Sequence, residues 1–194
     1  NIPEEMLRKV PGFQGAYDPH IWFDVKLWTR AVEGVSQGLQ QYDSTHQQEY
    51  RKNGEAYVRQ LDSLHNAVKR SIAEIPETQR VLITAHDAFG YFGDAYGIEV
   101  RGLQGISTLS EFGLRDVTEL VDFIISRKVK AIFVETSVSK KSIEAVVEGC
   151  RKKGWDVRIG GNLFSDAMGA AGTPEGNYIG MVNANVRTIV ESLK

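Results

Sequence analysis

Two histidines and one aspartate in this chain of 194 residues are placed where they could bind a metal together. His86 ends the stretch VLITAH, whose apolar and β-branched residues predict a buried strand. His20 lies in a tight Asp-Pro-His turn among large apolar residues, and a proline stiffens the backbone of such a turn. Asp166 lies in SDAMG, on a loop bordered by glycine. Two imidazoles and a carboxylate are typical ligands of a borderline transition metal.

The spacing of these residues is too wide for a local metal-binding loop, so only the tertiary fold could assemble such a site. Each histidine taken alone also fits a structural role, hydrogen-bonded inside a core. Asp87 and Ser165, which adjoin the candidate ligands, fit a helix cap as well as a functional role. His46 and His65 lie in a long polar helix and are expected at the surface.

Strand and helix patterns alternate after Pro76 and supply the frame for these residues. Apolar runs predict strands at residues 81–85, 98–101, 131–135 and 156–160. Helical spacing predicts helices near residues 88–96, 110–127, 139–153 and 175–192. This alternation predicts an α/β fold with a parallel four-stranded sheet flanked by helices. Ligands of such sheets lie beyond the carboxyl ends of the strands, the edge that would hold His86, Glu135 and Asp166.

Several helix ends can also be predicted. Ser110 or Glu111 is expected to open one helix and Ser137 or Ser139 the next, while Gly154 should follow the end of the latter.

The first part of the chain is irregular up to residue 24 and then predicts two helices. Apolar spacing predicts a helix at 25–41, with Asp24 as its N-cap. A second helix, at 44–73, would be over 40 Å long at about 1.5 Å per residue. It is mostly charged, with a narrow apolar stripe. A long polar helix often bridges two bodies, so we expect a partner for it.

Composition excludes some classes of protein. The formal net charge of −2 argues against a nucleic-acid binder, which needs clustered lysine and arginine. No apolar run approaches the roughly 20 residues that span a bilayer. Cys150 has apolar neighbours at helical spacing and is expected to be structural.

Several motifs resemble those of one known family. DPHIWFD, TAHDAFGYFGDAYGIEV and NLFSDAMG resemble, in order and environment, the metal-binding segments of the zinc- and manganese-type solute-binding proteins of ABC importers, the TroA-like receptors. GISTLSEFGLRDVTELVDFI is similar to the loop and helix that follow the third of the family's segments. The resemblance covers essentially the whole chain.

The resemblance implies two α/β lobes joined by a long helix, with one metal bound between them through four ligand positions. His20 matches the second position, His86 the third, which is His in some members and Glu in others, and Asp166 the fourth. Glu135 resembles a carboxylate that supports the site without binding the metal. The first ligand, a histidine of the N-terminal lobe, has no counterpart in this sequence.

Most of that lobe, a unit of roughly 100 residues, has no counterpart either. The resemblance implies that residues 1–43 are its tail, 44–75 the linking helix and 76–194 a complete C-terminal lobe. Because the first residue is Asn1 and not Met, we expect a mature, engineered or cleaved fragment. Helix faces that the missing lobe would cover could drive formation of a non-native oligomer. Three aromatic residues could do the same or could pack on the missing fragment: Trp22, Phe23 and Trp28.

The resemblance implies a binding protein and not an enzyme. It would be a lipoprotein of the periplasm or of the extracellular face of the membrane, which delivers a divalent ion to an ABC permease, with cell adhesion as a secondary role. Three imidazoles and a carboxylate suit Zn²⁺, whereas Mn²⁺ or Fe²⁺ stays open because a bidentate aspartate supplies more oxygen ligands.

Two alternatives stay open. The first is a metal-dependent hydrolase that uses the same ligands and leaves one position for water, with Asp87 or Glu135 as the only candidate general bases. The second is that this chain alone binds no metal and only the full-length protein functions.

Overall fold

The structure of the chain is a computed structural model, and it describes residues 2–9, 15–106, 113–137 and 139–194. Packing divides the chain into two compact units, Asn1–Lys69 and Arg70–Lys194. In the described ranges, no helix combines the length and the apolar character that crossing a membrane requires. Short 3₁₀ turns accompany the main elements: η1 (Glu4–Met6), η2 (Ile21–Phe23), η3 (Ser44–His46) and η4 (Glu77–Gln79).

Helix α1 (Val25–Tyr42) starts where the sequence predicts it. The Asp24 carboxylate accepts the backbone N–H of Lys26 at 2.8 Å, which confirms this residue as the N-cap. Of the three aromatic residues named as a possible oligomer surface, Phe23 is buried, and Trp22 and Trp28 are half-buried. The exposed apolar side chains of α1 are instead those near its end, namely Val35, Leu39 and Tyr42.

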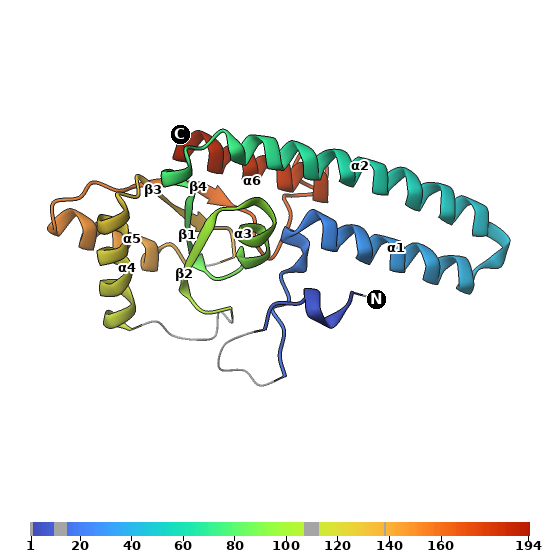
Figure 1. Cartoon of the computed structure of the whole chain (residues 1–194), viewed down its shortest axis with the longest axis horizontal. Helices are drawn as coiled ribbons and strands as arrows, with labels where there is room; N and C mark the ends of the chain where they lie inside the picture. The colour runs from blue at the N-terminus through green and yellow to red at the C-terminus, as the bar shows by residue number, and fades with distance from the viewer. Residues whose placement is uncertain (1, 10–14, 107–112, 138) are drawn as a thin grey trace. The chain divides into compact units, whose positions relative to one another are not determined.

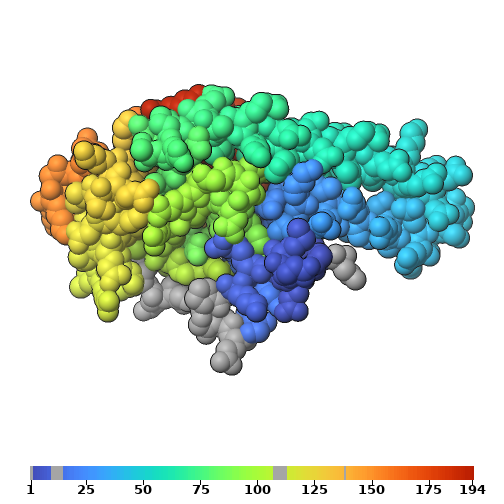
Figure 2. All heavy atoms as spheres, in the orientation of Figure 1, coloured from blue at the N-terminus to red at the C-terminus, as the bar shows by residue number. Residues whose placement is uncertain are grey.

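Helix α2 (Gln47–Ala73) has 27 residues and continues from η3, so the long helix predicted at 44–73 is present. Within the first unit it runs back along α1 (Figure 1). The helices approach closely at Gly54, where a Cβ would lie 2.5 Å from Ser36 Oγ. Tyr42, the last residue of α1 before the turn between the two helices (Figure 2), is 92% exposed.

The described part of the second unit contains four parallel strands in two hydrogen-bonded pairs. β1 (Val81–His86) pairs with β2 (Glu99–Gln104), and β3 (Ala131–Glu135) pairs with β4 (Arg158–Leu163). β1 and β3 lie side by side, so the strands run in the order β2, β1, β3, β4 (Figure 1). The α/β class with parallel strands flanked by helices is thus confirmed, but the described strands form two ladders and not one.

One contact helps to explain why β1 and β3 form no ladder at the end of β1. There a side chain accepts the backbone N–H that faces β3. The backbone N–H of His86 donates to Glu135 Oε1 at 3.0 Å.

Helices pack around these strands as predicted. α4 (Leu114–Arg127) and α5 (Lys141–Lys152) cover one face (Figure 1) and share a core with β1 and β3. α3 (Gly90–Tyr96) follows β1, and α6 (Tyr178–Leu193) packs against β4. The core under α4 and α5 includes Ile83, Ile124, Val134, Ile143 and Val146.

Two expected caps differ in the structure. Asp87 does not cap α3, because the N-cap residue of that helix is Phe89, and no side chain forms a capping hydrogen bond there. Of the two serines predicted to open α5, Ser137 does not: the helix begins at Lys141, behind Lys140 as N-cap, and Ser139 Oγ accepts the N–H of Lys141 at 3.4 Å.

The ends of two other helices are also defined. The predicted starts of α4 at Ser110 or Glu111 lie outside the described residues, and the described helix begins after Gly113, whose N–H donates to Asp116 Oδ2 at 2.7 Å. Gly154, at φ +82°, follows the end of α5 as predicted.

Cys150 is buried in the core of the second unit. Burial raises the pKa of its thiol to about 11, so the thiolate is scarce at neutral pH. The prediction of a structural cysteine is confirmed.

Candidate metal centre

His86 is the last residue of β1, a strand that is buried along its whole length. The packed strand fixes the backbone that carries the ring, and the His86 side chain itself is fully buried. The aromatic residues that follow the strand are buried as well: Phe89, Tyr91, Phe92 and Tyr96. The imidazole is therefore held in a place that water reaches poorly.

Glu135, at the end of β3, contacts His86 with both of its carboxylate oxygens. Oε1 accepts the backbone N–H of His86, and Oε2 pairs with the ring Nδ1. A carboxylate next to Nδ1 keeps the proton on that nitrogen, so Nε2 carries the lone pair that a metal needs. The sequence placed Glu135 near the site as a supporting carboxylate, and its contacts are of that kind.

Asp166 lies beyond β4 and approaches the same imidazole. Its Oδ2 is 3.5 Å from His86 Nε2, and its side chain is 37% exposed. Two ligand atoms of a tetrahedral Zn²⁺, each about 2.0–2.2 Å from the metal, lie roughly 3.4 Å apart. The spacing of the two atoms is therefore that of two ligands on one metal ion.

The pKa of His86 reflects this surrounding. Burial lowers the pKa, but the hydrogen bond with Glu135 and the negative charges of Glu135, Asp166 and Asp87 outweigh burial and raise it above the ordinary value of 6.5. In the metal-free chain the ring accordingly binds a proton more readily than a free histidine does. Proton and metal ion would compete for the same nitrogen.

His20, in the first unit, is oriented by a carboxylate from its own turn. A single oxygen, Asp18 Oδ1, accepts the backbone N–H of His20 at 2.9 Å and lies 2.7 Å from its Nδ1. Both side chains are buried, and the ring meets that of Trp22 edge-on at 5.2 Å. As with His86, Nδ1 is engaged by a carboxylate, and Nε2 is the ring nitrogen that a metal could use.

The structure brings His86 and Asp166 together within the second unit, as the sheet-edge rule predicted. His20 belongs to the first unit. The combined ligand set of His20, His86 and Asp166 therefore stays a prediction.

Sequence reasoning missed Asp18 as a partner of His20. The available signal was an aspartate two residues before the histidine, a spacing at which a carboxylate can accept a backbone N–H of the same turn.

The two remaining histidines differ from each other. His46 is exposed as expected and pairs with Asp43 at 2.8 Å. His65 is half-buried, so its expected surface position is only partly right; burial, with the charge of Lys26, lowers its pKa.

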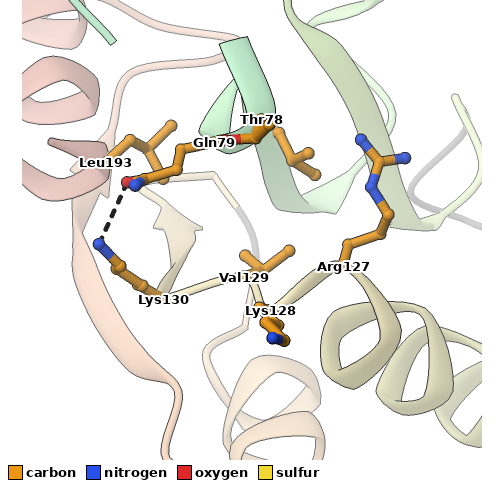
Figure 3. A pocket seen from close by; sticks show the side chains of 8 residues that line it. Thr78, Gln79, Arg127, Lys128, Val129, Lys130 and Leu193 are labelled. Atoms are coloured by element: carbon orange, nitrogen blue, oxygen red, sulfur yellow. Dashed lines mark hydrogen bonds between the residues drawn. The ribbon is translucent and has the colours of Figure 1, made fainter. Parts of the chain in front are cut away.

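A small cavity at the opposite end of the strands offers no comparable site. It lies where β1 and β3 begin, and Lys130 Nζ donates to Gln79 Oε1 across it at 3.2 Å (Figure 3). Its volume of about 10 Å³ is that of a single water molecule at most.

Comparisons with known proteins identify a family and several relatives. Residues 3–192 match the family described as Zinc-uptake complex component A periplasmic (ZnuA). The chain is 50% identical to the manganese-binding lipoprotein MntA of Bacillus subtilis over all 194 residues, which span 63% of that relative. It is 49% identical to the zinc-binding protein TroA of Treponema pallidum over 93% of this chain and 58% of that relative.

Solved structures show the same likeness. The periplasmic zinc-binding protein TroA of Treponema pallidum matches with a TM-score of 0.95 and 47% identity over 99% of this chain and 69% of that one. Fe(III)-bound YtgA of Chlamydia trachomatis matches with a TM-score of 0.85 and 26% identity over 96% of this chain and 67% of that one.

The chain belongs to the zinc-uptake complex component A family, as the sequence motifs indicated. It spans about 60% of the length of the curated relatives that it matches. Those relatives are named for the metals they bind, so the comparisons give no support to the hydrolase alternative.

Proposed function

We propose that this chain, as a member of that family, is the metal-binding part of an extracytoplasmic receptor for a divalent transition metal, Zn²⁺ or Mn²⁺, with Fe²⁺ a third candidate. The observation that supports this most directly is the buried His86 ring, whose Nε2 lies 3.5 Å from Asp166 Oδ2 while Glu135 holds Nδ1. A strand end that only satisfied a core hydrogen bond would not need a second carboxylate beside the other ring nitrogen.

Three residues of this chain would bind the metal: His20, His86 and Asp166. In this proposal Asp18 and Glu135 bind no metal and instead fix the tautomer and orientation of the two rings. Buried rings held in this way lose little freedom on binding, and their lone pairs are already directed toward the ion. A further ligand would come from the longer protein, as the family pattern implies.

The cellular role follows from the family. The protein would act in the periplasm or at the extracellular face of the membrane as a lipoprotein and pass its ion to an ABC permease. We assign no catalytic residue, because both oxygens of the Glu135 carboxylate are already engaged, one with the His86 backbone N–H and one with the ring Nδ1, and the carboxylate is poorly placed to activate water.

Calorimetric titration of the full-length protein with Zn²⁺ and with Mn²⁺ tests the proposal. We expect saturable binding of one ion, lost in D166A by at least about 100-fold, because removing a group that merely supports a ligand already costs roughly 10–100-fold. D156A is the matched control, since Asp156 is an exposed carboxylate of the same unit ahead of β4. Equal affinity in D166A and in the wild type would contradict the ligand assignment.

A further inference from the structure

The loop that carries Asp166 is held by a buried amide from another element. Asn185 lies on α6 and is only 3% exposed. Its Oδ1 accepts the backbone N–H of Phe164 at 2.9 Å, and its Nδ2 donates to the Phe164 carbonyl at 2.8 Å. One side chain thus pairs with both backbone groups of a residue two positions before the aspartate.

This contact replaces strand pairing just where β4 ends. The last residue of β4, Leu163, is still paired, because its carbonyl accepts the N–H of Thr136 at 3.1 Å. Phe164 comes next, and the amide of Asn185 offers it the donor and acceptor that a neighbouring strand would offer. The backbone therefore stays fixed beyond the sheet edge.

A second contact follows one residue later. Ser165 is buried, and its hydroxyl lies 2.6 Å from that of Ser137, in the loop after β3. Residues 163, 164 and 165 are therefore each tied to a different partner, and the next residue is the aspartate whose Oδ2 approaches His86 Nε2.

We infer that Asn185 is a positioning residue for Asp166, and that the Ser137–Ser165 hydroxyl pair assists it. This inference rests on the proposed function, because a fixed position of the Asp166 carboxylate matters only if that carboxylate binds the metal. A short loop without these contacts would let the backbone of Asp166 turn, and a misplacement of about 1 Å is enough to weaken a preorganised site.

The alternative is that Asn185 serves stability alone. Its amide lies on a helix whose inner face is otherwise largely apolar, and a buried amide is tolerated only when it is hydrogen-bonded. The structure offers a matched control for this alternative. Ser192 lies on the same helix, is 7% exposed and donates to the backbone of β4, to Gly160 O at 2.9 Å, within the strand and not in the loop that carries the aspartate.

The test compares N185D, N185L, S137A and S192A in the full-length protein. N185D keeps an acceptor for the Phe164 N–H but sets an oxygen against its carbonyl, and N185L removes both bonds. Three quantities are measured for each variant: the affinity for Zn²⁺ and Mn²⁺, the thermal midpoint of the metal-free form, and the visible spectrum of the Co²⁺ form, which reports coordination geometry.

We expect N185D and N185L to bind both metals about 10–100-fold more weakly, with an altered Co²⁺ spectrum, and S137A to show a smaller loss in the same direction. S192A should lower the thermal midpoint and leave affinity and spectrum unchanged. If N185L does not fold, N185D and S137A carry the test.

Two outcomes would overturn the inference. In one, N185D and S137A bind like the wild type although D166A does not, so that the proposed function stands and only the positioning role fails. In the other, S192A loses as much affinity as N185D for a similar fall in midpoint, so that the effect is one of stability. Should D166A itself bind like the wild type, the proposed ligand set fails first, and this inference fails with it.

Discussion

Two buried histidine–carboxylate pairs lie in different units of this chain and are built in different ways. In the first unit, Asp18 and His20 belong to one turn and are two residues apart. In the second unit, His86 and Glu135 come from two strands and are 49 residues apart. The local pair uses one oxygen for both of its contacts, whereas the distant pair uses two.

The number of oxygens decides how much each pair depends on being ionised. A single shared oxygen can also be supplied by an amide, which keeps both contacts in weaker form, because the other amide atom does not face the ring. Two oxygens that both face N–H donors cannot be replaced by an amide without turning one acceptor into a donor. The pair of His86 and Glu135, which the tertiary fold assembles, should therefore tolerate replacement of its carboxylate by an amide less well than the pair of His20 and Asp18.

The largest expected effect comes from removing the rings themselves. H20A and H86A should each weaken binding of Zn²⁺ and Mn²⁺ by more than about 100-fold in the full-length protein, because each deletes a ligand and not only its support. Calorimetry or competition with a chelator measures this loss. If H20A left the metal affinity unchanged while H86A abolished it, the pair of Asp18 and His20 would not belong to the metal site, and the comparison would fail.

The next effect separates the two carboxylates. E135Q should lose about 100-fold in metal affinity, because the amide NH₂ must face either the His86 backbone N–H or Nδ1. D18N should lose about 10-fold or less, because its remaining oxygen can keep both contacts while the NH₂ takes the position of Oδ2, 3.7 Å from Arg8 Nε. Competition titrations on the two variants give the ratio.

The control for these two variants is a conservative substitution at Glu135. E135D keeps the charge but shortens the side chain, so it should lose at least one of the two contacts and fall between the wild type and E135Q. Equal losses in E135Q and D18N would show that the number of contacting oxygens does not matter.

The pH dependence gives a smaller, graded effect. The raised pKa of His86 means that its protonated ring stabilises the metal-free fold below about pH 6.5, and that this contribution is lost as the pH rises through the folded-state pKa. Metal binding needs the neutral ring and so weakens as the pH falls, by about tenfold per pH unit for each proton displaced. Chelator competition between pH 8 and pH 5 measures this.

E135Q sharpens this test, because it removes the hydrogen bond and the charge that contribute most to raising the pKa of His86. The decline in affinity should then begin at a lower pH than in the wild type. An onset at the same pH in both proteins would contradict the assigned cause.

The smallest effect is expected at an exposed local pair, Asp43 and His46. Their contact raises the pKa of His46 and lowers that of Asp43, so it stabilises the fold between about pH 4 and pH 6.5 and fades on either side. D43N should lower the thermal midpoint only slightly and only in that window, since exposed pairs contribute little. Metal affinity should not change, and a loss of affinity would show that this turn is coupled to the site.

Much of the fold could be predicted because its signals are local. The N-cap at Asp24 and the glycine at residue 154 depend only on neighbouring backbone groups, and both are confirmed. The strands lie within about three residues of their predicted positions, because a buried run is recognised by composition alone. The cap assigned to Asp87 was wrong, because the start of a short helix depends on how the preceding loop packs.

The site was predictable to the level of the sheet edge and no further. Parallel strands place their carboxyl ends together, which was enough to expect His86, Glu135 and Asp166 near one another. The role of Asn185 could not be read from the sequence, since its helical position gives no sign of which backbone it meets. The two-oxygen contact of Glu135 likewise depends on the distance between two strands.

The sequence by itself determined the family, the alternation of strands and helices, and the residue types that can bind a metal, because motifs and periodicity are properties of short segments. It also placed His20 in a rigid turn whose carboxylate partner is only two residues away. Only the tertiary structure decided that Glu135 spans His86 with two oxygens and that Asn185 and Ser137 hold the loop of Asp166. Such contacts join residues that are 21 to 49 positions apart, and no local rule relates them before the chain has packed.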